Sequence, residues 1–310
     1  MKVNIRFQYL FLGAALMGLT AGSPHGGEAD STYQANFQED YNIYSLSIPE
    51  SLSFAGENVP LTDPDVRERL DRELLVNTYW QSNTLLMLKR ANRWLPEFKQ
   101  IFREEGVPED LVYLGLIESG FQNVVSPANA AGFWQFLSST GEEYGLIVDG
   151  EVDERYHPVK SARAAAQYLA SAKEEFGSWT LAAASYNMGK AGVRRQLERQ
   201  KVSNYYDLLL NSETARYVFR IIAVKEIVNR PGEFGFHLRD SDMYEAIPTE
   251  VVEVSGAVES WPDWAHEHGI NYKTLKYHNP WLREDYLRNR SNRTYQIEVP
   301  TDKSFISIPE

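Results

Sequence analysis

Apolar residues recur at helical spacing over much of the chain. From Asp63 onward, Val66, Leu70 and Leu74 follow one another at intervals of four, which indicates a helix with one buried face. Three later helical stretches each end at or just before glycine or proline, as helices commonly do; they cover residues 161–176, 179–188 and 213–228. We therefore expect residues 63–240 to form one all-helical domain.

The period of the pattern changes after residue 245. Residues 250–254 and 295–299 alternate polar and apolar side chains, which is typical of strands. Two short helical stretches lie between them, around Trp264 and around Leu275. This order predicts a small β-α-α-β domain over residues 248–302. The expected fold class is mainly α, with a small α+β domain at the C-terminal end.

Residues 1–22 have the layout of a Sec-type secretory signal peptide. A basic start with Lys2 and Arg6 precedes an apolar run over 7–19, and small residues follow. The run is shorter than the roughly 20 residues that cross a bilayer, but an uncleaved signal anchor stays open as an alternative. Residues 23–62 are rich in Gly, Ser, Asn, Asp and Glu and are expected to form a tether or extended arm. We expect an exported protein of the cell envelope or periplasm.

The charge and the amino-acid composition exclude several classes of function. The 310 residues include 31 Lys and Arg against 43 Asp and Glu, which gives a net charge of −12. Such a chain has no general attraction to phosphate backbones, so nucleic acid is not an expected partner. The chain has no cysteine. That excludes disulfides, thiolate metal sites, a cysteine nucleophile and a lipobox cysteine, and it does not contradict export, because exported proteins do not require disulfides.

One carboxylate continues an apolar stripe. On a helix, Leu111, Leu114, Gly115 and Glu118 share a face, and Gly120 ends the helix directly afterwards. Partial burial and the negative end of the helix dipole both disfavour the ionised carboxylate. Both effects raise its pKa toward the value that a general acid needs near neutral pH. The alternative is a frayed helix end, with this side chain pointing into water.

Two further segments place polar groups among apolar residues. Gln135 is the one amide within 132–136, Gly-Phe-Trp-Gln-Phe. Tyr186 and Asn187 end an alanine-rich helix, whose small side chains allow a neighbouring helix to approach closely. Taken alone, an Asn at a helix end is usually a cap, and a single Gln would be unremarkable.

In this order and spacing, the segments resemble the motifs of the family 1 soluble lytic murein transglycosylases, which share the goose-type lysozyme fold. The matching segments are Glu-Ser at the start of 118–121, Gly-Phe-Trp-Gln-Phe at 132–136 and Tyr-Asn-Met-Gly at 186–189. Glu-Ser-Gly-Phe at 118–121 and Val-Asp-Glu-Arg at 152–155 are most similar to the membrane-bound type D branch. The resemblance covers about residues 90–240 and implies a lysozyme-like catalytic domain.

The resemblance also implies roles for individual residues. Glu118 matches the catalytic acid of the family, and Ser126 matches a serine that contacts the N-acetyl region of the substrate. Ser185 and Met188 depart from the usual Ala-Tyr-Asn-Ala pattern and flank the polar pair without changing it. The other expected substrate-binding positions are Gln135, Leu137 (often Met in the family), Tyr186, Asn187, Glu213 and Tyr217. The family needs no metal ion and no organic cofactor.

The implied reaction cleaves the β-1,4 bond between N-acetylmuramic acid and N-acetylglucosamine and leaves 1,6-anhydromuramic ends. The expected partners are the glycan strands of peptidoglycan and, beyond them, cell-wall machinery. Glu118 would serve as acid and then as base. Asp153 and Glu154 lie in an acidic stretch that we expect to be a solvated loop, which orients its neighbours, for example through Arg155, and does not react.

The C-terminal domain resembles a LysM domain, which binds N-acetylglucosamine chains. The resemblance rests mainly on 252–256, Asn-Pro-Trp at 279–281 and 297–300. Ala257 stands where LysM domains usually have Asp, and 283–293 resembles an insertion. A structural cap therefore stays open as the alternative to glycan binding. The histidines of this domain lack a carboxylate at ligand spacing and are expected at the surface, not at a metal site; they are His266, His268 and His278.

Other functions remain compatible with these motifs. A hydrolase of the same fold would use water where the transglycosylase uses a sugar hydroxyl. A non-catalytic wall-binding module would keep the cleft for recognition, although a desolvated Glu118 has little use in a pure binder. A helical scaffold for partner proteins would require an exposed apolar stripe, and none stands out in the sequence.

Overall fold

The computed structural model describes residues 31–32, 35 and 43–301. The expected signal peptide lies outside the described residues, as does most of the expected arm before residue 43. Among the residues that the structure describes, no helix combines the length and the apolar character needed to cross a membrane.

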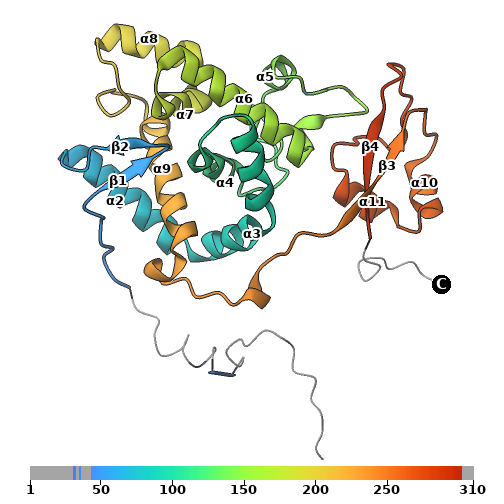
Figure 1. Ribbon diagram of the computed structural model, residues 1–310, viewed down its shortest axis with the longest axis horizontal. Helices are drawn as coiled ribbons and strands as arrows, with labels where there is room; N and C mark the ends of the chain where they lie inside the picture. The colour runs from blue at the N-terminus through green and yellow to red at the C-terminus, as the bar shows by residue number, and fades with distance from the viewer. Residues whose placement is uncertain (1–30, 33–34, 36–42, 302–310) are drawn as a thin grey trace, which may run out of the picture. The chain divides into compact units, whose positions relative to one another are not determined.

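Residues 64–242 are mainly helical, as the apolar spacing predicts (Figure 1). The α-helices are α2 (Pro64–Tyr79), α3 (Gln81–Glu104), α4 (Tyr113–Ser119), α5 (Ser138–Glu143), α6 (Pro158–Phe176), α7 (Trp179–Met188), α8 (Lys190–Gln200) and α9 (Ser212–Asn229). Short 3₁₀ turns are η1 (Glu109–Val112), η2 (Glu154–Tyr156), η3 (Pro231–Phe234) and η4 (Asp240–Asp242). The mainly helical fold class is confirmed for this part of the chain.

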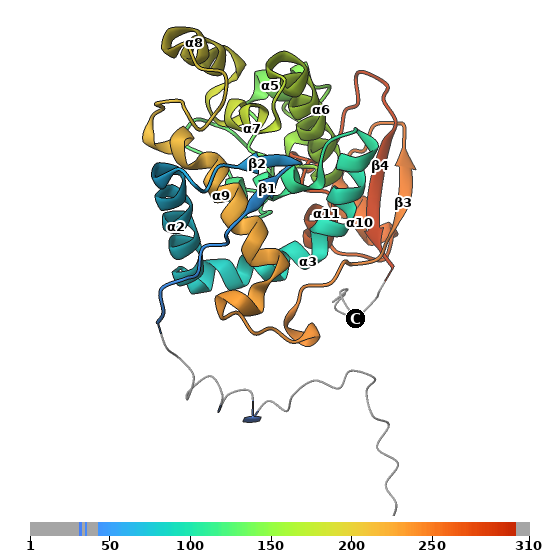
Figure 2. The ribbon, with the colours of Figure 1, turned by 60° about the vertical axis from the view of Figure 1, so that its left-hand side comes forward.

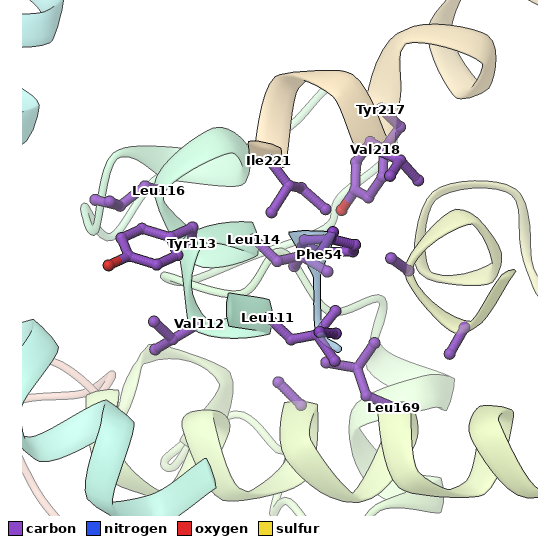
Figure 3. Close-up of a cluster of buried hydrophobic side chains, with 14 of the residues drawn as sticks. Phe54, Leu111, Val112, Tyr113, Leu114, Leu116, Leu169, Tyr217, Val218 and Ile221 are labelled. Carbon is purple, nitrogen blue, oxygen red and sulfur yellow. The ribbon is translucent and has the colours of Figure 1, made fainter. Parts of the chain in front are cut away.

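The helix α9 lies at the centre of the helical domain. Most of its residues are buried on several faces, and α2, α4 and α7 all pack against it. Figure 3 shows Val218 and Ile221 of α9 together with Leu114 of α4 and Phe54, and all four side chains are fully buried. Burying one such side chain contributes about 1.5–3 kcal/mol to stability. This packing fixes α4 against α9 and therefore fixes the side chains that the two helices direct toward each other.

A short hairpin completes this core within the segment expected to be an arm. β1 (Leu52–Phe54) and β2 (Glu57–Val59) pair antiparallel across a two-residue turn whose φ angles are 51° and 78°. The hairpin lies beside α9 in Figure 1 and Figure 2. Phe54, Val59 and Leu61 are buried in the helical core. The helical core thus includes residues of the expected arm, because scattered apolar side chains in a polar stretch find partners only in the tertiary structure.

The C-terminal domain has the predicted β-α-α-β order. β3 (Thr249–Val254) and β4 (Tyr295–Pro300) pair antiparallel, and α10 (Trp261–Glu267) and α11 (Tyr272–His278) lie between them in the chain. Figure 2 shows the two strands side by side. The core of this domain consists mainly of large apolar side chains that are at most 2% exposed; they include Trp261, Leu275, Trp281 and Ile297.

Candidate active site

Glu118 lies at the C-terminal end of α4, on the side that faces the core. The η1 turn leads directly into α4, so the predicted apolar stripe spans two elements and not one continuous helix. Leu111 and Leu114 of this stripe are fully buried, and Glu118 is partly buried. Gly120 ends the helix in the left-handed conformation, with φ 62° and ψ 32°, which glycine adopts without steric cost. The carboxylate at the end of an apolar stripe is therefore present.

The surroundings of Glu118 shift its protonation toward neutral pH. Burial raises the pKa of Glu118 from 4.5 to about 7. The hydroxyl of Tyr217, on α9, donates a hydrogen bond to Glu118 Oε1 and lowers the pKa, as does the charge of Arg220, while the charge of Glu213 raises it. The side chain is thus held by the protein and does not simply point into water. At neutral pH it exchanges readily between acid and base.

The two tyrosines of the predicted cleft are hydrogen-bond donors. Burial and the nearby charge of Glu118 raise the pKa of both Tyr186 and Tyr217 well above the ordinary value, so both stay protonated at neutral pH. Tyr217 donates to Glu118, whereas Tyr186 donates to the carbonyl oxygen of Trp134 at 2.7 Å. Tyr186 therefore joins the end of α7 to the segment that carries Gln135.

Asn187 joins the end of α7 to the start of α9. Its Nδ2 donates to Glu213 Oε1 at 3.0 Å, and its Oδ1 accepts from Thr214 Oγ1 at 2.7 Å. The residue that caps α7 is Gly189. Asn187 is thus not the helix cap that an isolated Asn would be; both of its polar atoms are oriented by α9.

Ser126, Gln135 and Leu137 lie on the irregular segment that follows α4. Ser126 Oγ accepts the amide of Ala130 at 3.0 Å. Gln135 has a φ of 51°, and its Nε2 donates to the carbonyl oxygens of Val124 and Gly132 at 2.9 and 2.7 Å. Leu137 is 46% exposed at the start of α5. Hydrogen bonds therefore join Glu118 to Tyr217 and Asn187 to Glu213, and Tyr186 to the segment that carries Gln135. Ser126 and Leu137 lie on the same segment as Gln135.

Three residues near Glu118 have contacts to which the sequence assigned no role. Arg90 Nε donates to the carbonyl of Gly120 at 2.5 Å, and Arg220 Nη2 donates to the carbonyl of Ile117 at 3.1 Å. Cations at these carbonyls stabilise the C-terminal end of α4. Ser119 Oγ donates to the carbonyl of Phe133 at 2.7 Å. Sequence offered a weak signal for Arg220, which follows Tyr217 by one helical turn, and none for Arg90, which is 28 residues from Glu118.

The acidic stretch before α6 was expected to be a solvated loop; Asp149 is exposed as expected, but residues 153–156 are buried. Asp153 is 6% exposed, Glu154 is 3% exposed and Arg155 is 8% exposed. Asp153 Oδ2 accepts from Arg155 Nη2 at 2.6 Å, and Glu154 pairs with Lys160. Burial is possible because these charges are paired and hydrogen-bonded.

Within the described part of the chain, no three His, Cys, Asp or Glu side chains are grouped so that they could hold a metal ion. His266 and His268 are exposed and His278 is partly buried. The ring of His268 stacks on Trp264 with their centroids 3.7 Å apart.

Two segments of the chain match known protein families. Residues 97–209 match the family described as Transglycosylase SLT domain, and 250–303 match the Soluble lytic transglycosylase C-terminal LysM-like domain. The first match contains Glu118 and Asn187 and ends before Tyr217.

The chain is also 30% identical over 272 residues to the membrane-bound lytic murein transglycosylase D of Escherichia coli (strain K12) and, equally, to that of Escherichia coli O6:H1. The alignment covers 84% of this chain and 58% of each relative, so the chain spans little more than half of their length. The helical domain of this chain is therefore similar to transglycosylase SLT domains, and its C-terminal domain is similar to the LysM-like domain of soluble lytic transglycosylases.

Proposed function

We propose that this chain is a peptidoglycan lytic transglycosylase in which Glu118 is the single acid and base. The observation that carries the proposal is a partly buried carboxylate with a pKa of about 7, hydrogen-bonded by Tyr217. Such a group has both the acid and the base form available at neutral pH. The SLT family match and the relatives named as lytic murein transglycosylases support the reaction class.

In the first step, protonated Glu118 donates its proton to the glycosidic oxygen between N-acetylmuramic acid and N-acetylglucosamine. The bond between that oxygen and the anomeric carbon of the muramic residue breaks. The acetamido group of the substrate stabilises the positive charge that develops at this carbon.

In the second step, the Glu118 carboxylate accepts the proton of the muramic C6 hydroxyl. The hydroxyl oxygen bonds to the anomeric carbon and closes the 1,6-anhydro ring. Water is not consumed, and Glu118 ends the cycle protonated. The hydrogen bond from Tyr217 stabilises the carboxylate formed between the two steps, while burial stabilises the acid.

A second reacting carboxylate is not needed in this scheme. Glycosidases with two carboxylates place them roughly 5–9.5 Å apart. The carboxylate whose charge acts on Glu118 is Glu213, which is exposed and accepts a hydrogen bond from Asn187. We assign Glu213 to holding Asn187 in the cleft, with no part in bond breaking.

The remaining predicted positions are assigned to substrate binding. The exposed side chain of Leu137 offers an apolar surface that suits the face of a sugar ring. Asn187 is held by α9, and Tyr186 is held by the carbonyl of Trp134, next to Gln135. Ser126 and Gln135 lie on the irregular segment that follows α4.

The proposed location is the cell envelope, where the substrate occurs. The LysM-like domain would add affinity for the glycan strands, or act as a structural cap if that affinity has been lost. The proposed export signal over 1–22 is tested by N-terminal sequencing of the protein recovered from fractionated cells. Recovery with an intact N-terminus in the membrane fraction would favour the signal anchor.

The central test is mass spectrometry of the muropeptides that residues 23–310 release from purified peptidoglycan. We expect products with terminal 1,6-anhydromuramic residues. The matched control is Glu118→Gln, which keeps the shape of the side chain and should lower release by at least ~100-fold, the usual contribution of a general acid or base. Products with reducing ends would identify a hydrolase. Absence of release, with the protein still sedimenting with the sacculus, would favour the non-catalytic binding module.

A further inference from the structure

The segment between α5 and α6 pairs directly with the C-terminal domain (Figure 1). Val152 forms an antiparallel bridge with Leu282, and the amide of Asp153 donates to the carbonyl of Trp281 at 2.9 Å. Val152 and Leu282 are at most 1% exposed and belong to the apolar cluster of the C-terminal domain. This segment is therefore built into the C-terminal domain although it precedes that domain by about a hundred residues.

Polar contacts strengthen the same junction. The carbonyl of Glu151 accepts the amide of Arg283 at 2.9 Å, and Glu151 Oε2 accepts the amide of Arg288 at 2.8 Å. The guanidinium of Arg283 lies 4.0 Å from the centre of the Tyr156 ring. Backbone pairing, a carboxylate and a stacked cation thus hold residues 151–156 in one position against the C-terminal domain.

On its other side, the segment 151–156 holds the turn formed by residues 129–136, which carries Gln135. Arg155 Nε and Nη2 bind the two oxygens of Asp153 at 2.9 and 2.6 Å. Its Nη1 donates to the carbonyls of Asn129 and Phe136 at 3.0 and 3.2 Å. The guanidinium therefore connects the two ends of the turn through a fork that only arginine provides.

The backbones of the two segments also touch. A Cβ atom at Gly132 would lie 1.8 Å from the carbonyl oxygen of Arg155, so only glycine fits there. Ala131, directly before it, belongs to the apolar cluster of the C-terminal domain. The next residues include Trp134, whose carbonyl holds Tyr186, and Gln135 itself. A shift of Arg155 must therefore move the turn of the cleft.

We propose that Arg155 is a positioning residue for the substrate cleft and that the C-terminal domain holds Arg155 in place. The C-terminal domain would then support the geometry of the catalytic site, in addition to any binding of glycan. This inference rests on the proposed function, because it concerns the geometry of that cleft. A displacement of about 1 Å in a positioning element can lower turnover about 100-fold.

A double-mutant cycle tests this inference in the intact chain. We expect Arg155→Lys, which keeps the charge and loses the fork, to lower kcat/KM for a defined glycan strand by about 10-fold or more. The factor by which Gln135→Ala lowers kcat/KM should then be at least threefold smaller in the Arg155→Lys background than in the wild type, because the turn is already displaced. The pH at which kcat/KM falls should not change, since Glu118 is untouched.

The matched control is Arg230→Lys, which also removes a guanidinium that pairs with carboxylates, at the far end of α9. In this background Gln135→Ala should keep its full effect. Additive effects in both backgrounds, or wild-type activity of Arg155→Lys, would overturn the proposal. If the wild type releases no muropeptides, the proposed function itself fails, and the cycle is not needed to show it.

A second measurement does not depend on how well Arg155→Lys folds. Glu151→Ala removes a contact with the C-terminal domain and leaves Arg155 and the turn unaltered in sequence. We expect faster hydrogen–deuterium exchange in peptides that cover residues 129–136 of the intact variant. Exchange that stays at the wild-type rate in these peptides would show that the C-terminal domain does not hold the turn.

Discussion

Removing the hydroxyl of Tyr217 is expected to move the pH dependence of the reaction to higher pH. The first step needs protonated Glu118, so kcat/KM falls as the pH rises through the pKa of this residue, about 7. The hydrogen bond from Tyr217 favours the ionised carboxylate and lowers that pKa. Tyr217→Phe deletes the bond and keeps the ring, so the pKa rises and the fall in activity begins at higher pH.

The size of the shift follows from the strength of such a bond. A hydrogen bond to a charged group contributes about 1.5–3 kcal/mol, and one pKa unit corresponds to about 1.36 kcal/mol. Partial solvent access at Glu118 weakens the interaction, so the lower half of this range applies. We therefore expect the midpoint to move upward by about 1 unit. The carboxylate formed after the first step is also less stable, so kcat should fall even below pH 6.

The assay is kcat/KM for a soluble glycan strand measured from pH 5 to pH 9. The matched control is Tyr205→Phe. The hydroxyl of Tyr205 donates to the carbonyls of Thr214 and Ala215 at 2.8 Å on the same helix, and not to Glu118. This control should lower thermal stability and leave the midpoint unchanged. A midpoint that stays the same in Tyr217→Phe, or moves to lower pH, would refute the assignment of Glu118 as the acid tuned by Tyr217.

Three further predictions concern stability. Folding raises the pKa of Glu118 from 4.5 to about 7, so the free energy of unfolding falls by about 3 kcal/mol in total as the pH rises through this interval. Glu118→Gln should therefore stabilise the chain against urea at pH 8 and much less at pH 5. Equal stabilisation at both pH values would contradict this prediction. Gly132→Ala places a Cβ atom 1.8 Å from the carbonyl oxygen of Arg155 at a φ of 82°. It should lower the free energy of unfolding by roughly 4 kcal/mol or prevent folding. In the control Gly150→Ala, the new Cβ atom meets nothing within 4 Å, so the melting temperature should stay nearly unchanged. Burial alone would raise the pKa of Glu57, but hydrogen bonds from the start of α7 lower it. Glu57→Ala should lower the free energy of unfolding by about 2 kcal/mol at pH 7, and by less below pH 4.5. If urea titrations show the same loss of stability at every pH, the charge of Glu57 has no role.

Periodicity and helix-ending residues predicted most of the fold. The alanine-rich run ending at Gly177 and the alternation of the two C-terminal strands are local signals, because backbone preference and side-chain spacing decide them within a few residues. The hairpin with Phe54 gave no such signal. Its strands have three residues each and are stable only because the helical core covers them.

The prediction for Asp153 and Glu154 was wrong because a local signal was present but the tertiary structure overrode it. Asp153 and Glu154 have the composition of a solvated loop, and local rules place isolated charges in water. Their cationic partners, Arg155 and Lys160, lie close in the sequence, but burial also required the C-terminal domain, whose Trp281 accepts the amide of Asp153. No pattern within the stretch carries that information.

Local sequence signals account for most of the helices, for the two C-terminal strands and for the candidate acid. Glu118 stands at the end of an apolar stripe and before a glycine, and this local arrangement already predicted a raised pKa for a buried carboxylate. The groups around Glu118 were brought together by the tertiary fold. Tyr217 lies 99 residues later in the chain and Arg90 lies 28 residues earlier, and both reach the end of α4 because α9 and α3 pack there. The physical reason is that short-range preferences act along the chain, whereas the electrostatic environment of a site depends on all groups within a few ångströms, whatever their distance in sequence.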